Sequence, residues 1–83
     1  MTDLEYDILD ELYFVISYEE LIQQVDMAES DLRKGIFELF SKGWVRVFSD
    51  PDETLDYENL TEELLSTGYL LASKAGLKAH NSA

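Results

Sequence analysis

The side chains with the clearest chemical potential are the cations of residues 33–49, which hold four of the six basic residues in the chain. They are Arg33, Lys34, Lys42 and Arg46. Clustered cations bind nucleic acid because they neutralise phosphates. The formal net charge of the chain is −12, however, and such a field disfavours anionic partners. Two alternatives follow: a nucleic-acid-binding face, or a solvated face of mixed charge in which Lys34 pairs with Glu38 one helical turn further on.

Catalytic and metal-binding patterns are absent from the sequence. The chain has no cysteine, and His80 is its only histidine. Because catalysis needs positioned acids, bases or nucleophiles, we predict that the protein is not an enzyme and has no cofactor. His80 is expected to be solvent-exposed in a frayed C-terminal tail. The acidic stretch "DPDETLDYE" lacks the glycine and the final glutamate spacing of a calcium loop, so no metal site is predicted.

The elements that must position the cations begin with three helices. Thr2 and Glu5 have the spacing of a capping box, which predicts a helix over residues 3–12. Residues 13–17, "YFVIS", favour a short extended segment. Ser17 and Glu20 form a second capping-box pattern, so a helix is predicted over residues 18–25. A polar turn then offers Asp26, Glu29 or Ser30 as the boundary of a third helix.

The third helix is predicted over residues 29–42 because its apolar residues share one face. Those residues are Leu32, Ile36, Leu39 and Phe40. Gly35 costs about 1 kcal/mol relative to alanine inside a helix, and the close approach of another backbone would explain its presence. Gly43 stands where a left-handed residue ends a helix, with Lys42 at the negative end of the helix dipole.

A two-stranded hairpin is expected to follow. Residues 44–48, "WVRVF", alternate as a strand does, and residues 69–72, "YLLA", form the second candidate. The long connection between them suggests one or two helical turns after Asn59 or Thr61, which pack on this domain or on a partner. Ser73 caps a last helical segment.

This order of elements resembles a winged helix-turn-helix domain. The stretch "EELIQQVDMAESDLRKGIFELFSKGWVRV" is similar to the helix, turn, recognition helix and "kGlv.r" segment of MarR-like and PadR-like transcriptional regulators. The later "YLLASKAG" resembles their "y.LT.kG", with Ser73 in place of the usual threonine. The resemblance covers residues 8–80 and implies a small α+β fold with a three-helix core and a two-stranded wing that carries a helical insertion.

The resemblance also implies a DNA contact surface, with the third helix in the major groove. The implied nucleic-acid-binding residues are Ser30, Arg33, Lys34, Phe37, Ser41, Lys42 and Arg46. Two features depart from the family pattern. Residues 50–66 form an acidic insertion where relatives have basic wing tips, and residues 1–32 contain no basic residue. The expected function is DNA binding in transcription regulation, and the alternative is an acidic protein-interaction module that does not bind DNA.

The candidate partners are double-stranded DNA, a basic protein or a second copy of the chain. A less favoured third idea is an acidic decoy that competes with DNA for a basic protein. Trp44 and Phe48 alternate with the valines of their strand, so they either cover a flank of this domain or form an exposed aromatic patch. With 83 residues, no cysteine and no membrane-length apolar run, the chain is predicted to be a single domain, residues 1–83, located in the cytoplasm and not in a membrane.

Overall fold

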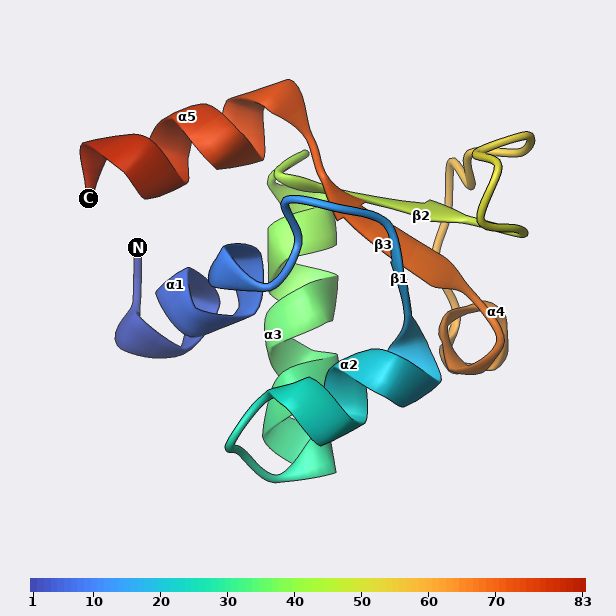
Figure 1. The fold of residues 1–83 in the computed structure, drawn as a ribbon, viewed down its shortest axis with the longest axis horizontal. Helices are drawn as coiled ribbons and strands as arrows, with labels where there is room; N and C mark the ends of the chain where they lie inside the picture. The colour runs from blue at the N-terminus through green and yellow to red at the C-terminus, as the bar shows by residue number, and fades with distance from the viewer.

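A computed structural model describes all residues from 1 to 83 and has an α+β architecture with five helices and one three-stranded antiparallel sheet (Figure 1). In chain order the elements are α1 (Asp3–Asp10), β1 (Ile16–Ser17), α2 (Tyr18–Gln24), α3 (Glu29–Ser41), β2 (Val45–Phe48), α4 (Glu62–Ser66), β3 (Tyr69–Ala72) and α5 (Lys74–Ser82). The longest helix, α3, runs through the middle, with α1 beside it and the sheet at one end (Figure 1).

The first two helices begin at the side-chain caps that the sequence predicts. The Thr2 hydroxyl accepts the backbone N–H of Glu5 at 3.1 Å, and the Glu5 carboxylate accepts that of Thr2 at 3.0 Å, so the capping box is complete. The Ser17 hydroxyl accepts the N–H of Glu20, but the reciprocal bond of a capping box is absent. Helix α3 begins at Glu29 without a side-chain cap, since Ala28 precedes it.

Helix α1 packs directly against α3 at Gly35. A Cβ atom at this position would lie 2.5 Å from Cδ1 of Ile8 and 2.7 Å from Cδ2 of Leu4. The close neighbours of Gly35 are therefore side chains of α1 and not the backbone that we expected. The missing side chain lets the two helices approach, which offsets the cost of glycine inside a helix.

The strands form a sheet of order β1-β3-β2, in which β3 lies in the centre. Val45 pairs with Ala72 and Phe48 with Tyr69, as expected for a hairpin of β2 and β3. The expectation of only two strands was wrong, because Ile16 also pairs with Leu70 and adds β1 on the other side of β3. Gly43, with φ +77°, turns the chain from α3 into β2 as predicted.

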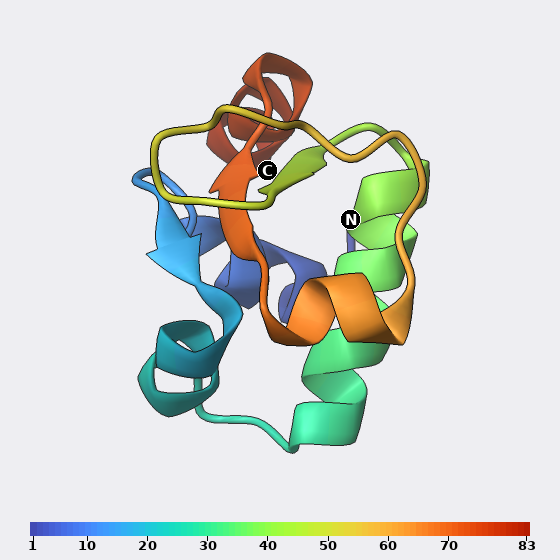
Figure 2. The ribbon, with the colours of Figure 1, turned by 90° about the vertical axis from the view of Figure 1, so that its right-hand side faces the viewer.

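The connection between β2 and β3 folds back toward the helices. Thr61 accepts the N–H of Leu64 and begins α4, which confirms the predicted helical turns. Leu65 of α4 is fully buried in the core, and α4 packs against α2 (Figure 2). The insertion therefore packs on its own domain.

Helix α5 crosses beside α1 and is regular to Ser82 (Figure 1). Ser73 caps it by accepting the N–H of Gly76 at 3.0 Å. A Cβ atom at Gly76 would overlap the carbonyl oxygen of Trp44, so this glycine allows the helix to lie on the start of β2. The expectation of a frayed tail was wrong, because packing on α1 stabilises the last helix.

One hydrophobic core joins the helices and the sheet. Its buried side chains are Ile8, Leu9, Leu12, Tyr18, Leu21, Leu32, Ile36, Leu39, Val45, Val47, Leu65, Leu70 and Ala72. Phe40, which the helical pattern assigned to this core, is only partly buried at its edge. None of the five helices is both long enough and apolar enough to cross a bilayer.

Candidate nucleic-acid interface

The seven predicted contact residues lie on α3, at its C-terminal cap and on β2. Five of them are on α3: Ser30, Arg33, Lys34, Phe37 and Ser41. Lys42 is the C-cap residue, and Arg46 lies in β2. The fold thus distributes them over two consecutive elements, and the bonds that each one makes decide whether it is available to a ligand.

Arg33 is held by carboxylates of the same chain. Its Nη1 donates to Oε2 of Glu29 at 2.9 Å, one turn earlier on α3. Its Nε lies 3.9 Å from Oε1 of Glu62, which α4 brings beside α3. The insertion between the two strands therefore adds negative charge to the helix that would read DNA.

Lys42 forms the closest ion pair of the molecule. Its Nζ lies 2.6 Å from Oε2 of Glu5, whose side chain is only 1% exposed. Burial raises the pKa of Glu5, but the hydrogen bond and charge of Lys42 and the bonds to Thr2 outweigh this effect, so the pKa is lowered. The Lys42 ammonium also lies 4.8 Å from the centre of the Trp44 ring. Lys42 thus fastens the end of α3 to the start of α1.

Arg46 is held in the same way by the insertion. Its Nε donates to Oδ2 of Asp56 at 3.0 Å, and its guanidinium carbon lies 4.9 Å from the centre of the Phe48 ring. Phe48 is fully buried, so the exposed aromatic patch that includes it does not exist. Trp44 is half-buried and packs against the core. The alternation of residues in β2 did not predict the burial of Phe48, because residues 49–57 return beside β2 and Phe48 forms a bridge with Asp56.

The remaining predicted residues differ in their access to solvent. Phe37 is half-buried and packs against the core, so it does not project freely from α3. Ser30 is exposed, while the Ser41 hydroxyl donates to the carbonyl of Glu38 at 2.8 Å. Lys34 is exposed and has no carboxylate oxygen within 4.0 Å, so the expected pair with Glu38 does not form. Lys34 is the one cation of residues 33–49 without a carboxylate partner.

A cluster of aromatic and polar side chains surrounds His80, which the sequence analysis predicted to be solvent-exposed. His80 is 7% exposed and stacks on Tyr6, with ring centres 4.2 Å apart. The Tyr13 hydroxyl lies 2.7 Å from Nδ1 of His80 and donates to Oδ1 of Asn81 at 2.9 Å. The spacing of Tyr6 and Asp10, at i and i+4, is the signal that α1 presents these two side chains to α5, and Tyr13 joins them from the segment that follows α1.

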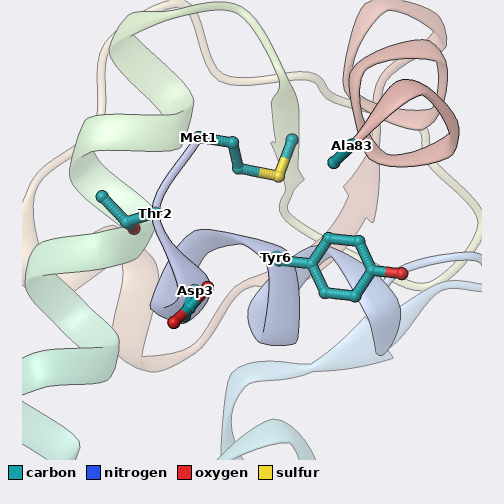
Figure 3. A pocket seen from close by; sticks show the side chains of 5 residues that line it. All are labelled: Met1, Thr2, Asp3, Tyr6 and Ala83. Carbon is teal, nitrogen blue, oxygen red and sulfur yellow. The ribbon is translucent and has the colours of Figure 1, made fainter.

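The cavities are shallow and carry no catalytic arrangement. The largest, about 310 Å³, is lined by Met1, Thr2, Asp3, Tyr6 and Ala83, of which only Asp3 has an acidic side chain (Figure 3). A hollow of about 270 Å³ lies beside Lys34 between α1 and α3. We call the third cavity, of about 190 Å³, the acidic groove. Its lining includes the carboxylates of Asp7, Asp10, Glu11 and Asp26.

No group of three or more histidine, cysteine, aspartate or glutamate side chains is arranged to hold a metal ion. The three cavities likewise lack a nucleophile paired with a base. Comparison with family models, with curated proteins and with solved structures finds no match to this chain.

Proposed function

We propose that this chain is a small winged-helix domain that acts by contacting other proteins and catalyses no reaction. The order α1, α2, α3 followed by the hairpin of β2 and β3, with β1 on the other side of β3, supports the winged-helix assignment. So does the resemblance of the segment from α2 to β2 to MarR-like and PadR-like regulators. Because one fold serves many functions, the choice of partner rests on the charged groups.

The observation that carries the proposal is that three of the four cations expected to meet DNA already contact carboxylates of the chain. Glu29 holds Arg33 at 2.9 Å, Glu5 holds Lys42 at 2.6 Å, and Asp56 holds Arg46 at 3.0 Å. Each carboxylate neutralises the positive charge that would otherwise attract a DNA phosphate. Phosphates approaching Arg33 or Arg46 would also meet the negative field of the insertion.

The pair of Lys42 and Glu5 opposes DNA binding most strongly. Moving Lys42 onto a phosphate would leave the buried Glu5 carboxylate without its main partner, at a cost of about 1–3 kcal/mol. The pairs of Arg33 and Arg46 are more exposed and exchange more easily, since such surface pairs contribute only about 0.2–1 kcal/mol.

The salt dependence expected of a DNA complex is therefore small. Each phosphate contact contributes nearly one unit to the slope of log affinity against log salt concentration. With Lys34 as the only unpaired cation of residues 33–49, the slope would be about 1, far below that of specific DNA-binding proteins. An acidic domain of this kind suits a basic protein partner.

A second candidate function, duplex binding by α3, is favoured by the exposure of Lys34 and Ser30 on the helix that enters the major groove in winged-helix proteins. The exchangeable pairs of Arg33 and Arg46 would then reorganise around phosphates. This candidate and the first one differ in a single measurable property, saturable binding to a duplex.

That property is tested by fluorescence anisotropy with a labelled duplex of about 25 base pairs in about 50 mM salt. The wild-type chain is expected to show no saturable binding. Glu29→Gln/Asp56→Asn, the released variant, removes the nearest carboxylate of Arg33 and of Arg46 and should bind more tightly than the wild type. The control Asp52→Asn/Glu53→Gln removes the same two charges from loop residues that pair with no cation.

Equal gains in the released and control variants would show that total charge, and not masking of Arg33 and Arg46, limits DNA binding. Saturable binding by the wild type that Lys34→Ala weakens would overturn the protein-interaction proposal and establish the second candidate.

A further inference from the structure

We infer that this domain binds an arginine-bearing peptide segment of another protein. The binding surface is formed by α1, the segment that follows α1, the adjoining side of α5 and the turn after α2. This inference rests on the proposed function and specifies its partner. The surface has two parts. One is the aromatic strip, defined as Tyr6, Tyr13 and Phe14, and the other is the acidic groove.

The aromatic strip consists of three exposed aromatic side chains. Phe14 is 84% exposed, Tyr6 39% and Tyr13 38%. Tyr6 and Tyr13 are held in place by His80, which stacks on the first and meets the second edge-on at 5.4 Å between ring centres. Because contacts with His80 orient the rings of Tyr6 and Tyr13, these two rings offer stacking surface at low cost in side-chain entropy.

The acidic groove lies at the C-terminal end of α1, against residues that follow α2. Asp7, Asp10 and Glu11 line it from α1 and its cap, and Asp26 lines it from the other side. Residues 1–32 contain no basic side chain, so no cation of this segment neutralises the four carboxylates. None of the four forms an ion pair with a lysine or arginine of the chain.

Asp10 connects the two parts of the surface through its contact with His80. It lines the acidic groove, and its Oδ1 lies 3.4 Å from Nε2 of His80. This Nε2 is buried and makes no hydrogen bond. The Tyr13 hydroxyl contacts Nδ1, the other nitrogen of the same imidazole ring, at 2.7 Å. The His80 ring therefore lies against the Asp10 carboxylate and against the rings of Tyr6 and Tyr13.

Adjacent carboxylates and aromatic rings select a guanidinium group. Arginine offers a planar fork that matches a carboxylate and also stacks on aromatic faces, whereas the ammonium of lysine does neither as well. A second copy of this chain is a poor occupant, because it would bring a further net charge of −12. Charge complementarity therefore favours a basic segment of a different protein.

The test uses two labelled peptides of equal length and charge, one with arginines spaced by glycine and serine and one with lysines in their place. Anisotropy titrations of the full chain give the affinities. Asp7→Asn/Asp10→Asn changes the groove and Phe14→Ala changes the strip. The matched control, Asp52→Asn/Glu53→Gln, removes two charges from the loop before α4. Phe14→Ala should remain folded, because the Phe14 side chain is exposed and contributes little to the core.

The arginine peptide should bind severalfold more tightly than the lysine peptide. Each surface variant should weaken it about tenfold, while the control changes its affinity less than about twofold. Absence of saturable binding overturns the inference, as does an equal loss in the groove and control variants, or an unchanged affinity in Phe14→Ala.

Light scattering completes the experiment. A monomer is expected, and a dimer that Phe14→Ala dissociates would assign the surface to a second copy and overturn the inference. These outcomes are separate from the proposed function, which fails only when the wild-type chain binds duplex DNA as described above.

Discussion

The ammonium nitrogen of Lys42 lies 2.6 Å from Oε2 of Glu5 and joins the C-terminal cap of α3 to the first turn of α1. The two residues are 37 positions apart in the chain. Glu5 also completes the capping box with Thr2. One buried carboxylate therefore stabilises the start of α1 and holds the C-terminal end of α3 against it. A cation expected to bind phosphate is thus a structural cation.

Lys42→Met should lower the free energy of unfolding by about 1–2 kcal/mol at pH 7, because the buried carboxylate of Glu5 loses its partner. Partial exposure of Lys42 places the effect in the lower part of the range for such pairs. Urea denaturation measures it, with Lys34→Met as the control that changes less than about 0.5 kcal/mol.

The pKa of Glu5 is lowered in the folded chain, so its contribution to stability is present above the unfolded pKa and is lost as pH falls through the folded pKa. The difference between the wild type and Lys42→Met should therefore shrink in acid. A difference that is the same at neutral and strongly acidic pH would contradict the role of this ion pair.

Tyr18 should make the domain sensitive to alkali. Burial, followed by the charge of Glu29 and the hydrogen bond to it, raises the pKa of Tyr18 to about 12. A raised pKa contributes stability that is complete below the unfolded pKa, about 10, and is lost as pH rises toward 12.

Tyr18→Phe should flatten the fall in unfolding free energy across this alkaline window by up to about 2 kcal/mol. Denaturation at a series of pH values measures the slope. The control is Tyr57→Phe, a half-buried tyrosine whose hydroxyl forms no hydrogen bond within the chain. If both variants flatten the curve equally, the contact between Tyr18 and Glu29 is not its source.

Gly76→Ala should destabilise the domain by about 1–3 kcal/mol, although alanine favours helices, because its Cβ meets the backbone carbonyl of Trp44. Thermal denaturation measures the loss. Gly35→Ala is the comparison and should cost less, since its neighbours are the ends of the Ile8 and Leu4 side chains, which move more easily than a backbone. The reverse order would show that α5 is displaced from β2 at little cost.

His80→Ala should cost about 2–3 kcal/mol, because it removes the ring between Tyr6 and Tyr13 and leaves a cavity between α1 and α5. Amide hydrogen exchange should rise first in α5, whose docking depends on that ring. Lys78→Ala, an exposed change on the same helix, should leave both stability and exchange near the wild-type values. If amide hydrogen exchange in α5 is unchanged in His80→Ala, the contacts of Gly76 and Leu77 are sufficient to keep α5 packed on the domain.

The helices and the central hairpin could be predicted from the sequence because their signals are local. Thr2 and Ser17 cap the helices that follow them, and Gly43 ends α3 within one residue of the expected position. Such signals act over a few residues, where the backbone geometry of each residue type is decisive.

The candidate site could be predicted only as a set of residue types. The sequence determined that four cations are concentrated between residues 33 and 49, on a helix and a strand. Tertiary structure decided that Glu5 and Asp56 neutralise Lys42 and Arg46. It also placed His80 against Tyr13, 67 positions away, and buried Phe48. Ion pairing and burial depend on which distant segments pack together, and residue spacing along the chain does not encode those contacts.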